Sequence, residues 1–302
     1  MVALALSYLT TSHQSAEIAE IRAKLATAKT NPGAFQEANE LIVKCIESDA
    51  VKSAADYSFL SRSYWPSQNR LQGMRVKYEL SLAALCMGDP TARKDLAVNW
   101  NLLMGALDRP YRFKNPPTAP FFGSSDEKLT AQTVRDIWSG HVPRKQSDNL
   151  EVKKLFDADQ KARQSDFSKF TMKDFERFER EDRARLSRAR QILAKGNLFT
   201  GADFERTAFI FQHSDRFADY ATAHELGVCA FLLGNKSASW IAGAAYDRMM
   251  LRGSYPQRFG TQFYITNGKA IFDNIDESVM NDSMRKAVIR KTLKEAREQK
   301  FN

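Results

Sequence analysis

The chain has 302 residues, of which 43% are hydrophobic and 27% are charged, and these proportions are ordinary for a globular protein. Its length is enough for a substantial core and predicts two domains rather than one. The net charge is +9, but basic and acidic residues are mixed along the chain, as between residues 176 and 183. No nucleic-acid-reading motif accompanies this charge, so nucleic acid is not expected as a partner. No apolar stretch reaches the ~20 residues of a membrane span.

The three cysteines give no sign of a disulfide framework or a metal site. Cys45, Cys86 and Cys229 are far apart, and each lies in an apolar helical pattern. A free thiol in such a pattern behaves as a small hydrophobic side chain, so we predict no metal and no other cofactor. Residues 1–9 are apolar but lack a preceding basic residue. This favours a cytoplasmic location and leaves a periplasmic one open if a signal has been trimmed.

Helical spacing of apolar residues dominates the chain. Ile18, Ile21 and Leu25 begin the pattern, which predicts an N-terminal helical domain over residues 1–108. Residues 109–148 hold five of the nine prolines and are predicted to be a Pro-rich linker or long loop. Residues 149–302 then form a predicted C-terminal helical domain. Within it, the run from Thr200 to Asp203 fits a capping box that opens a helix.

A weak internal repeat links the two halves of the chain. Residues match at a constant separation, namely Glu79 with Glu225, Leu80 with Leu226, Ala84 with Ala230, Gly88 with Gly234 and Ala92 with Ala238. In each copy a helix ends at the glycine, a short turn follows and a second helix begins. This pattern predicts a mainly α fold of stacked antiparallel helical hairpins, tetratricopeptide-like or Sel1-like in character.

One short segment departs from the helical pattern and predicts a β-hairpin over about residues 262–275. Asn267 and Gly268 can adopt the positive φ angles of a type I′ turn, and β-forming residues flank them. An isolated hairpin is marginal in water, so it must pack on the helices, where it could cover a site. A final helix is expected to begin at Asp276 or Ser278 and to run to about Gln299.

Polar residues inside apolar stretches of the second half form a set of motifs. They are the D-Q-x-x-R run from Asp159 to Arg163, the pair Gln212-His213, the pair Asp247-Arg248 and the run from Pro256 to Gln262. Together they resemble the motifs of a bacterial family of domains of unknown function, the one numbered 6624, over about residues 149–302. The resemblance implies a fold and a set of motif residues, but it implies no established activity.

These polar residues have two interpretations, a ligand site or a buried structural network. Asp159 and Arg163 share one face of a helix and can pair. His213 lies at a helix C-terminus, where it can cap free carbonyls or serve a site. Asp247 and Arg248 point about 100° apart on a helix, so each needs a separate partner, for example Arg163 for Asp247.

The remaining candidates are the amides and the hydroxyl between residues 257 and 262, and the pair His224-Glu225. The former can bind a substrate or clamp the hairpin onto helix ends. The latter is similar to half of a zinc-binding H-E-x-x-H motif, but Val228 takes the place of the second histidine. We therefore predict no metalloprotease, and we expect His224 to be a core histidine with its hydrogen bonds satisfied.

The sequence thus predicts a polar pocket for a small polar or peptide-like ligand. The predicted ligand-binding residues are Gln212, Arg248, Gln257, Thr261, Gln262, Asp159 and Arg163, and the predicted catalytic, proton-handling pair is His213 with Asp247. Metal-independent acyl or amide chemistry fits such a pair, although catalysis itself is left open. The alternative is a non-catalytic helical-repeat module that binds a protein partner, with the polar cluster as a structural network. The site interpretation requires His213, Asp247, Arg248 and Gln257 to converge on a cavity open to solvent.

Overall fold

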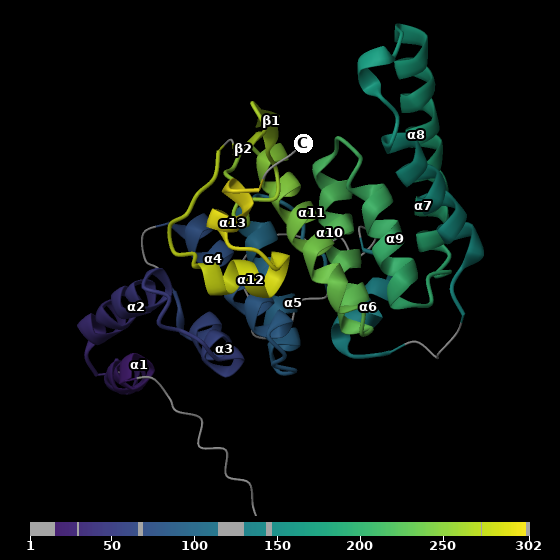
Figure 1. Cartoon of the computed structure of the whole chain (residues 1–302). Coiled ribbons are helices and arrows are strands. Elements are labelled where there is room, and N and C mark those ends of the chain that lie inside the picture. The colour runs from purple at the N-terminus through teal and green to yellow at the C-terminus, as the bar shows by residue number, and fades with distance from the viewer. Residues whose placement is uncertain are drawn as a thin grey trace, which may run out of the picture.

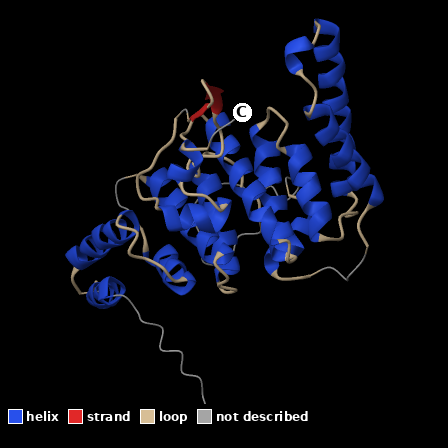
Figure 2. Ribbon diagram, in the orientation of Figure 1, coloured by secondary structure: helices blue, strands red, loops and turns tan. Residues whose placement is uncertain are grey.

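The computed structural model describes residues 16–28, 30–65, 69–113, 130–142, 147–272 and 274–299. Within these residues the fold is mainly α-helical, with one two-stranded antiparallel sheet near the C-terminus (Figure 2). This confirms the predicted fold class. None of the described helices combines the length and the apolar character that a membrane crossing needs.

The helices fall into two similar series. The first half contains α1 (Ala16–Thr27), α2 (Pro32–Glu47), α3 (Ala54–Ser63), α4 (Arg70–Cys86), α5 (Ala92–Ala106) and α6 (Gln132–Ser139). The second half contains α7 (Leu150–Arg163), α8 (Met172–Ala194), α9 (Gly201–Phe211), α10 (Phe217–Leu232), α11 (Ser239–Arg252), α12 (Asp282–Ile289) and α13 (Leu293–Arg297). Helix α6 lies within the predicted linker, 109–148, of which residues 114–129 and 143–146 are outside the described part. The three-part domain division stays a prediction.

The start of α9 follows directly from its local sequence. The Thr200 side chain accepts a hydrogen bond from the Asp203 N–H, and the Asp203 carboxylate accepts one from the Thr200 N–H. This reciprocal arrangement satisfies two N–H groups that the first turn of a helix leaves without partners. The predicted capping box is confirmed, and it sets where the helix that leads to His213 begins.

The C-terminal helix differs from the prediction of one helix from residue 276 or 278 to 299. It is two short helices, because Arg290 adopts the left-handed conformation, with φ of 62°, and ends α12. Helix α12 also begins later, after Asn281, whose side chain caps the Met284 N–H. The Asp276 carboxylate instead accepts from the Ser278 N–H in a turn, so this pair does not start the helix.

Two helical hairpins, α4–α5 and α10–α11, form the centre of the molecule (Figure 1). The first helix of each ends at a glycine with positive φ, 104° at Gly88 and 97° at Gly234. Helices α10 and α11 approach closely at Gly227, where an added Cβ would lie 2.8 Å from the Ala242 nitrogen. The sequence repeat therefore corresponds to equivalent hairpins, whereas their tetratricopeptide or Sel1 character stays a prediction.

The two halves of the chain share one core. A single cluster of buried apolar side chains extends from Ile18 to Ile289. Helix α12 packs on α4 of the first half as well as on α11, and α6 packs on α10 of the second half as well as on α5 (Figure 1). Each half thus contributes a helix that covers the central hairpin of the other half.

The predicted β-hairpin is present and consists of β1 (Tyr264–Thr266) and β2 (Lys269–Ile271). Tyr264 pairs with Ile271, and the turn residues Asn267 and Gly268 have φ angles of 52° and 71°. Both angles are positive, as a type I′ turn requires. Strand β2 packs against α13, so the hairpin does rest on a helix, as expected from its small size.

Candidate functional site

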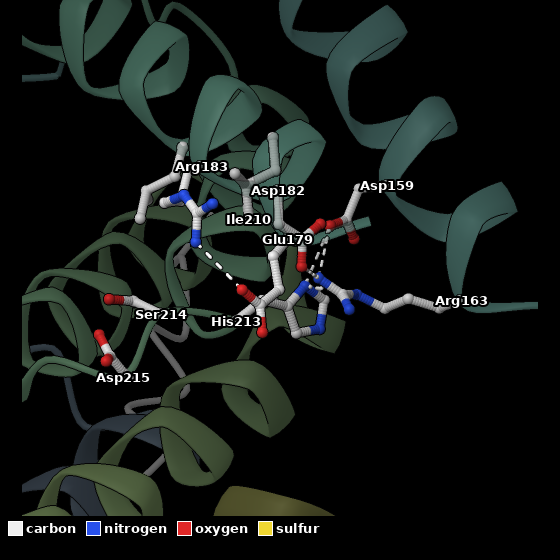
Figure 3. Close-up of a pocket in the computed structure, with 10 residues that line it drawn as sticks. Asp159, Arg163, Glu179, Asp182, Arg183, Ile210, His213, Ser214 and Asp215 are labelled. Carbon is white, nitrogen blue, oxygen red and sulfur yellow. Dashed lines mark hydrogen bonds and ion pairs between the residues drawn. The ribbon is translucent and has the colours of Figure 1, made fainter. Parts of the chain in front are cut away.

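Three of the predicted site residues meet between α7 and the end of α9. Asp159 and Arg163 lie one turn apart on α7, and His213 follows the last turn of α9 (Figure 3). The Arg163 Nη2 atom is 3.0 Å from the Asp159 Oδ1 atom, and the His213 Nδ1 atom is 3.1 Å from the same oxygen. The structure therefore brings together two residues predicted to bind ligand and one predicted to handle protons.

These residues border an open cleft of about 320 Å³. Its other lining residues come mainly from α8 and from the turn after α9 (Figure 3). The complete lining is Asp159, Arg163, Glu179, Asp182, Arg183, Leu186, Ile210, His213, Ser214 and Asp215. The β-hairpin contributes none of these residues, so it does not cover this cleft as the sequence suggested.

Burial and pairing set the charge state of Asp159. The residue is only 1% exposed. Burial opposes ionisation, but the hydrogen bond with His213 and the electrostatic interactions with His213 and Arg163 outweigh it and lower the pKa of Asp159. Asp159 is thus an anion in the folded protein, and Arg163 extends the network by donating to Asp182 at 2.7 Å.

Two groups compete for the same nitrogen of His213. The Arg163 Nε atom is 2.8 Å from Nδ1, and the Asp159 Oδ1 atom is 3.1 Å from it. Arg163 can only donate, so its bond requires a lone pair on Nδ1, whereas the bond to Asp159 requires a proton there. The two bonds exclude each other, and the position of one proton decides which of them forms. In both cases Nε2 keeps no hydrogen-bond partner among the described residues, which leaves it available to a ligand.

The cleft contains a hydroxyl next to His213, but it is engaged elsewhere. The Ser214 hydroxyl donates to the Asp219 Oδ2 atom at 2.6 Å. A serine nucleophile would instead need its hydroxyl within hydrogen-bond reach of the histidine base. The arrangement therefore lacks the serine–histidine contact of acyl-transfer sites, although His213 and Asp159 alone form the base-and-carboxylate half of such a site.

Asp247 lies outside the cleft, where its carboxylate holds the loop that follows α11; we call this arrangement the Asp247 clamp. It is fully buried, and its carboxylate accepts hydrogen bonds from the backbone N–H groups of Arg258, Phe259 and Thr261 and from the Thr261 hydroxyl, at 2.8 to 3.0 Å. Among the described residues, no hydrogen bond or ion pair joins Asp247 to His213 or to Arg163. The predicted proton-handling pair is thus not formed, because helix α11 directs Asp247 toward the chain that follows it.

The polar residues after α11 complete the same clamp. The Gln257 side chain donates to the Gln262 carbonyl at 2.8 Å and accepts from the Gln262 N–H at 3.0 Å. The Gln262 side chain in turn donates to the Thr261 hydroxyl at 2.9 Å. These amides and this hydroxyl shape a loop rather than line the cleft, which corresponds to the structural interpretation that the sequence left open.

Gln212 and Arg248 also do not line the cleft. Gln212 is 5% exposed and ends α9. Arg248 interacts with Tyr220, and burial lowers the pKa of its guanidinium. Its Nε atom is buried and has no hydrogen-bond partner among the described residues. Together with Asp247 and Gln257, these residues do not converge with His213 on one open cavity.

Sequence reasoning missed the buried ion pair of Arg258. Arg258 donates from Nε and Nη2 to the Glu79 carboxylate at 2.9 and 3.0 Å, and both side chains are 0% exposed. The Tyr246 hydroxyl donates to the same carboxylate at 3.0 Å. Arg258 lies inside the motif from Pro256 to Gln262, but its partner is 179 residues away and nothing local identifies it.

A second buried pair was missed in the predicted linker. Arg112 donates from Nε and Nη2 to the Glu225 carboxylate at 2.7 and 2.9 Å, and the Trp100 indole N–H donates to it at 2.9 Å. A signal for both pairs exists in the sequence, because Pro110-x-Arg112-Phe113 recurs as Pro256-x-Arg258-Phe259.

His224 is the buried core histidine that was predicted, with hydrogen bonds to Tyr78 and to the Ala242 carbonyl.

The described residues contain no cluster of histidine, cysteine and carboxylate groups that could hold a metal ion. Cys45 and Cys229 are buried free thiols and Cys86 is a half-buried one. Comparisons with family models, with curated proteins and with solved structures found no match to this chain. The resemblance to the family of unknown function therefore stays a prediction.

Proposed function

We propose that this chain binds a small polar, peptide-like ligand in the cleft around His213, and that the ligand carries an amino group. The proposal rests on the Asp159–Arg163–His213 contact at the wall of an open cleft. A buried carboxylate that fixes one ring nitrogen of a histidine and leaves the other without a protein partner is an arrangement that recognises or moves a proton.

Charge around the cleft supports an amino group as the ligand's recognised part. Asp159 and Asp182 are paired with Arg163, and Glu179 accepts a hydrogen bond from Arg183 at 3.2 Å. The remaining carboxylate, Asp215, is exposed and has no ion-pair partner among the described residues. A lone carboxylate at the rim favours a cation, and the ammonium group of an amine or of a peptide N-terminus satisfies it.

We propose that the function of this cleft is ligand binding rather than acyl or amide chemistry. The Ser214 hydroxyl is held by Asp219, so a hydrolytic reaction would require His213 to activate a water molecule instead. Binding requires no such step and uses the same residues.

The binding of amines provides the test. Glycylglycine, a simple monoamine and the N-acetylated dipeptide are titrated into the full chain by calorimetry. We expect the two amines to bind and the acetylated dipeptide to bind at least about tenfold more weakly, which corresponds to about 1.4 kcal/mol. The variants His213→Asn and Asp215→Asn are each expected to weaken amine binding by a similar factor.

His141 supplies the matched control, because it is an exposed histidine outside the cleft. The variant His141→Asn should bind the amines like the unmodified chain. Absence of amine binding to the unmodified chain would refute the proposal, and so would equal losses in His141→Asn and His213→Asn.

A second candidate function is the non-catalytic module that binds a protein partner. One observation favours it, the exposed apolar side chains where α7 meets α8, at the end of this pair that extends beyond the other helices (Figure 1). Phe167, Met172 and Phe175 are 38%, 74% and 39% exposed there. Under this alternative, His213→Asn has no effect on function, whereas Phe175→Ser removes it without changing the thermal midpoint.

A further inference from the structure

The repeat seen in the sequence extends much further than its first five matches. The equivalent residues are separated by 146 positions, the separation of Tyr78 from His224. At this separation Trp100 corresponds to Tyr246, Asn101 to Asp247, Pro110 to Pro256, Arg112 to Arg258 and Phe113 to Phe259. Asp108 and Ser254, also equivalent, both have positive φ, 53° and 65°. The backbone conformation thus recurs at this equivalent position, together with the residue types around it.

Equivalent residues make equivalent local contacts. The Asn101 Oδ1 atom accepts from the backbone N–H groups of Arg112 and Phe113, at 3.0 and 3.1 Å. The Asp247 Oδ1 atom accepts from the N–H groups of the equivalent arginine and phenylalanine, at 2.8 and 3.0 Å. In each copy a side chain near the end of a helix therefore holds the segment that carries the buried arginine.

Two buried ion pairs cross from one copy to the other. Arg258 of the second copy binds Glu79 of the first, and Arg112 of the first copy binds Glu225 of the second. The aromatic residues cross in the same way, because the Tyr246 hydroxyl donates to Glu79 and the Trp100 indole N–H donates to Glu225. The glutamate of each copy therefore accepts hydrogen bonds from an arginine and an aromatic side chain of the other copy.

Two pairs of equivalent residues also touch each other. Tyr78 is hydrogen-bonded to His224, and the rings of Trp100 and Tyr246 pack in a tilted arrangement with their centroids 6.5 Å apart. A residue contacts its own equivalent only near a two-fold axis that relates the two copies, which is the signature of a symmetric dimer interface. The helix contacts show the same symmetry. Helix α6 is equivalent to α12 and α4 is equivalent to α10, and α6 packs on α10 just as α12 packs on α4.

We propose that this chain is an intramolecular dimer. Its two units are residues 54–139, which hold α3 to α6, and residues 201–289, which hold α9 to α12. The face that carries the crossed arginine–glutamate pairs is an interaction surface, and its partner is the other unit of the same chain. This inference concerns the core and is independent of the ligand proposed for the His213 cleft.

Exchange of the two residues at the axis tests the symmetry in the full chain. The variant Tyr78→His places two histidines at the axis, and His224→Tyr places two tyrosines there. The double variant restores one of each, and by the symmetry we expect the Leu96 carbonyl, equivalent to that of Ala242, to accept from the relocated imidazole. We expect each single variant to lower the thermal midpoint by about 5 °C or more. The double variant should recover at least half of that loss. A double variant that loses the sum of the two single losses overturns the proposal.

Cleavage of the chain between the units gives a second, separate test. A protease site replaces residues 143–146 of the full chain, and the cleaved protein is examined by native mass spectrometry. We expect one complex of both fragments with the mass of the uncleaved chain. Cleaved protein that carries Arg112→Met and Arg258→Met should separate at least about tenfold more readily on dilution.

The matched control for cleavage is Arg188→Met. Arg188 pairs with Glu151 at 2.6 Å, which joins α8 to α7 outside the proposed interface. The cleaved Arg188→Met protein should remain a complex like the cleaved unmodified chain. Separation of the cleaved unmodified chain at micromolar concentration, or equal separation of the control, would contradict the crossed-pair interface.

Discussion

Tyr78 and His224 occupy equivalent positions in the two units and are hydrogen-bonded to each other in the middle of the core. The His224 Nδ1 atom lies 2.7 Å from the Ala242 carbonyl, which can only accept. Nδ1 therefore carries the proton, and Nε2 accepts from the Tyr78 hydroxyl. Both nitrogens are satisfied by a neutral imidazole, whereas protonation of Nε2 would end its role as acceptor for the Tyr78 hydroxyl and would place a charge in the buried core.

This neutral histidine predicts a loss of stability in weak acid. Burial lowers the pKa of His224 to about 4, from 6.5 in the unfolded chain. Between these values the unfolded chain binds a proton that the folded chain does not. Stability is therefore complete above pH 6.5 and falls as the pH decreases to 4, by about 3 kcal/mol for this residue.

Urea unfolding at half-unit steps from pH 7.5 to 4 measures this effect. The variant His224→Gln removes the titration, so its stability should change less over this interval than that of the unmodified chain. Its stability at pH 7.5 will be lower, because a buried contact is lost, and only the slope is compared. Parallel slopes for the two proteins would be inconsistent with a buried neutral His224.

The Arg258–Glu79 pair predicts an asymmetric response to mutation. Removing one partner of a buried ion pair takes away the main compensation of the other charge, which destabilises proteins by about 3–5 kcal/mol. We expect Arg258→Met to lie in this range. The double variant Arg258→Met with Glu79→Leu should be less destabilised than the single variant, because the Glu79 charge is then removed together with that of Arg258. Chemical unfolding of the three proteins provides the measurement, and a double variant worse than the single one would contradict the burial of this pair.

Asp247 and Asn101 each suit the contacts of their own unit, so we predict that replacing either residue by the type found in the other unit destabilises the protein. Asp247→Asn keeps an oxygen for two backbone N–H groups, but it turns an amide donor toward the donors of Thr261. We therefore expect a loss of about 1–3 kcal/mol. Asn101→Asp keeps Oδ1 as an acceptor but loses the bond from Nδ2 to the Phe113 carbonyl, and the second oxygen faces that carbonyl. A loss of similar size is expected, and thermal unfolding of both variants would show whether the positions are equivalent.

Asp159 predicts a stability difference that disappears in acid. Its pKa is lowered in the folded protein, so its contribution is complete above the unfolded value of about 3.9 and is lost as the pH falls through the folded pKa. Asp159→Asn should be less stable than the unmodified chain at pH 6, and the two curves should converge as the pH falls below 4. A constant gap across this interval, measured by urea unfolding, would mean that ionisation of Asp159 contributes nothing.

Most of the secondary structure could be predicted from the sequence, because its causes are local. The capping box at Thr200, the Asn267-Gly268 turn and the spacing of Ile18, Ile21 and Leu25 act over a few residues. The later start of α12 was not predicted because several polar residues in a row can cap a helix. Tertiary contacts decide which of them does, and Asn281 also donates to the Ile46 carbonyl.

The candidate site could be predicted only in part. Asp159, Arg163 and His213 were assigned to one site and lie in contact, whereas Asp247, Arg248 and the residues from 257 to 262 were assigned to the same site and lie apart from it. All of these are polar residues in apolar surroundings, and such residues serve sites and structural networks equally well.

The sequence by itself determined the helices, the hairpin turn and the recurrence of Glu79, Gly88 and Arg112 as Glu225, Gly234 and Arg258. These follow from backbone preferences and from the order of residues. Only the tertiary structure decided that each arginine binds the glutamate of the opposite unit, and that Asp247 holds a loop while His213 faces a cleft. The physical reason is that a buried charge needs a partner in space, and that partner can lie 179 residues away along the chain.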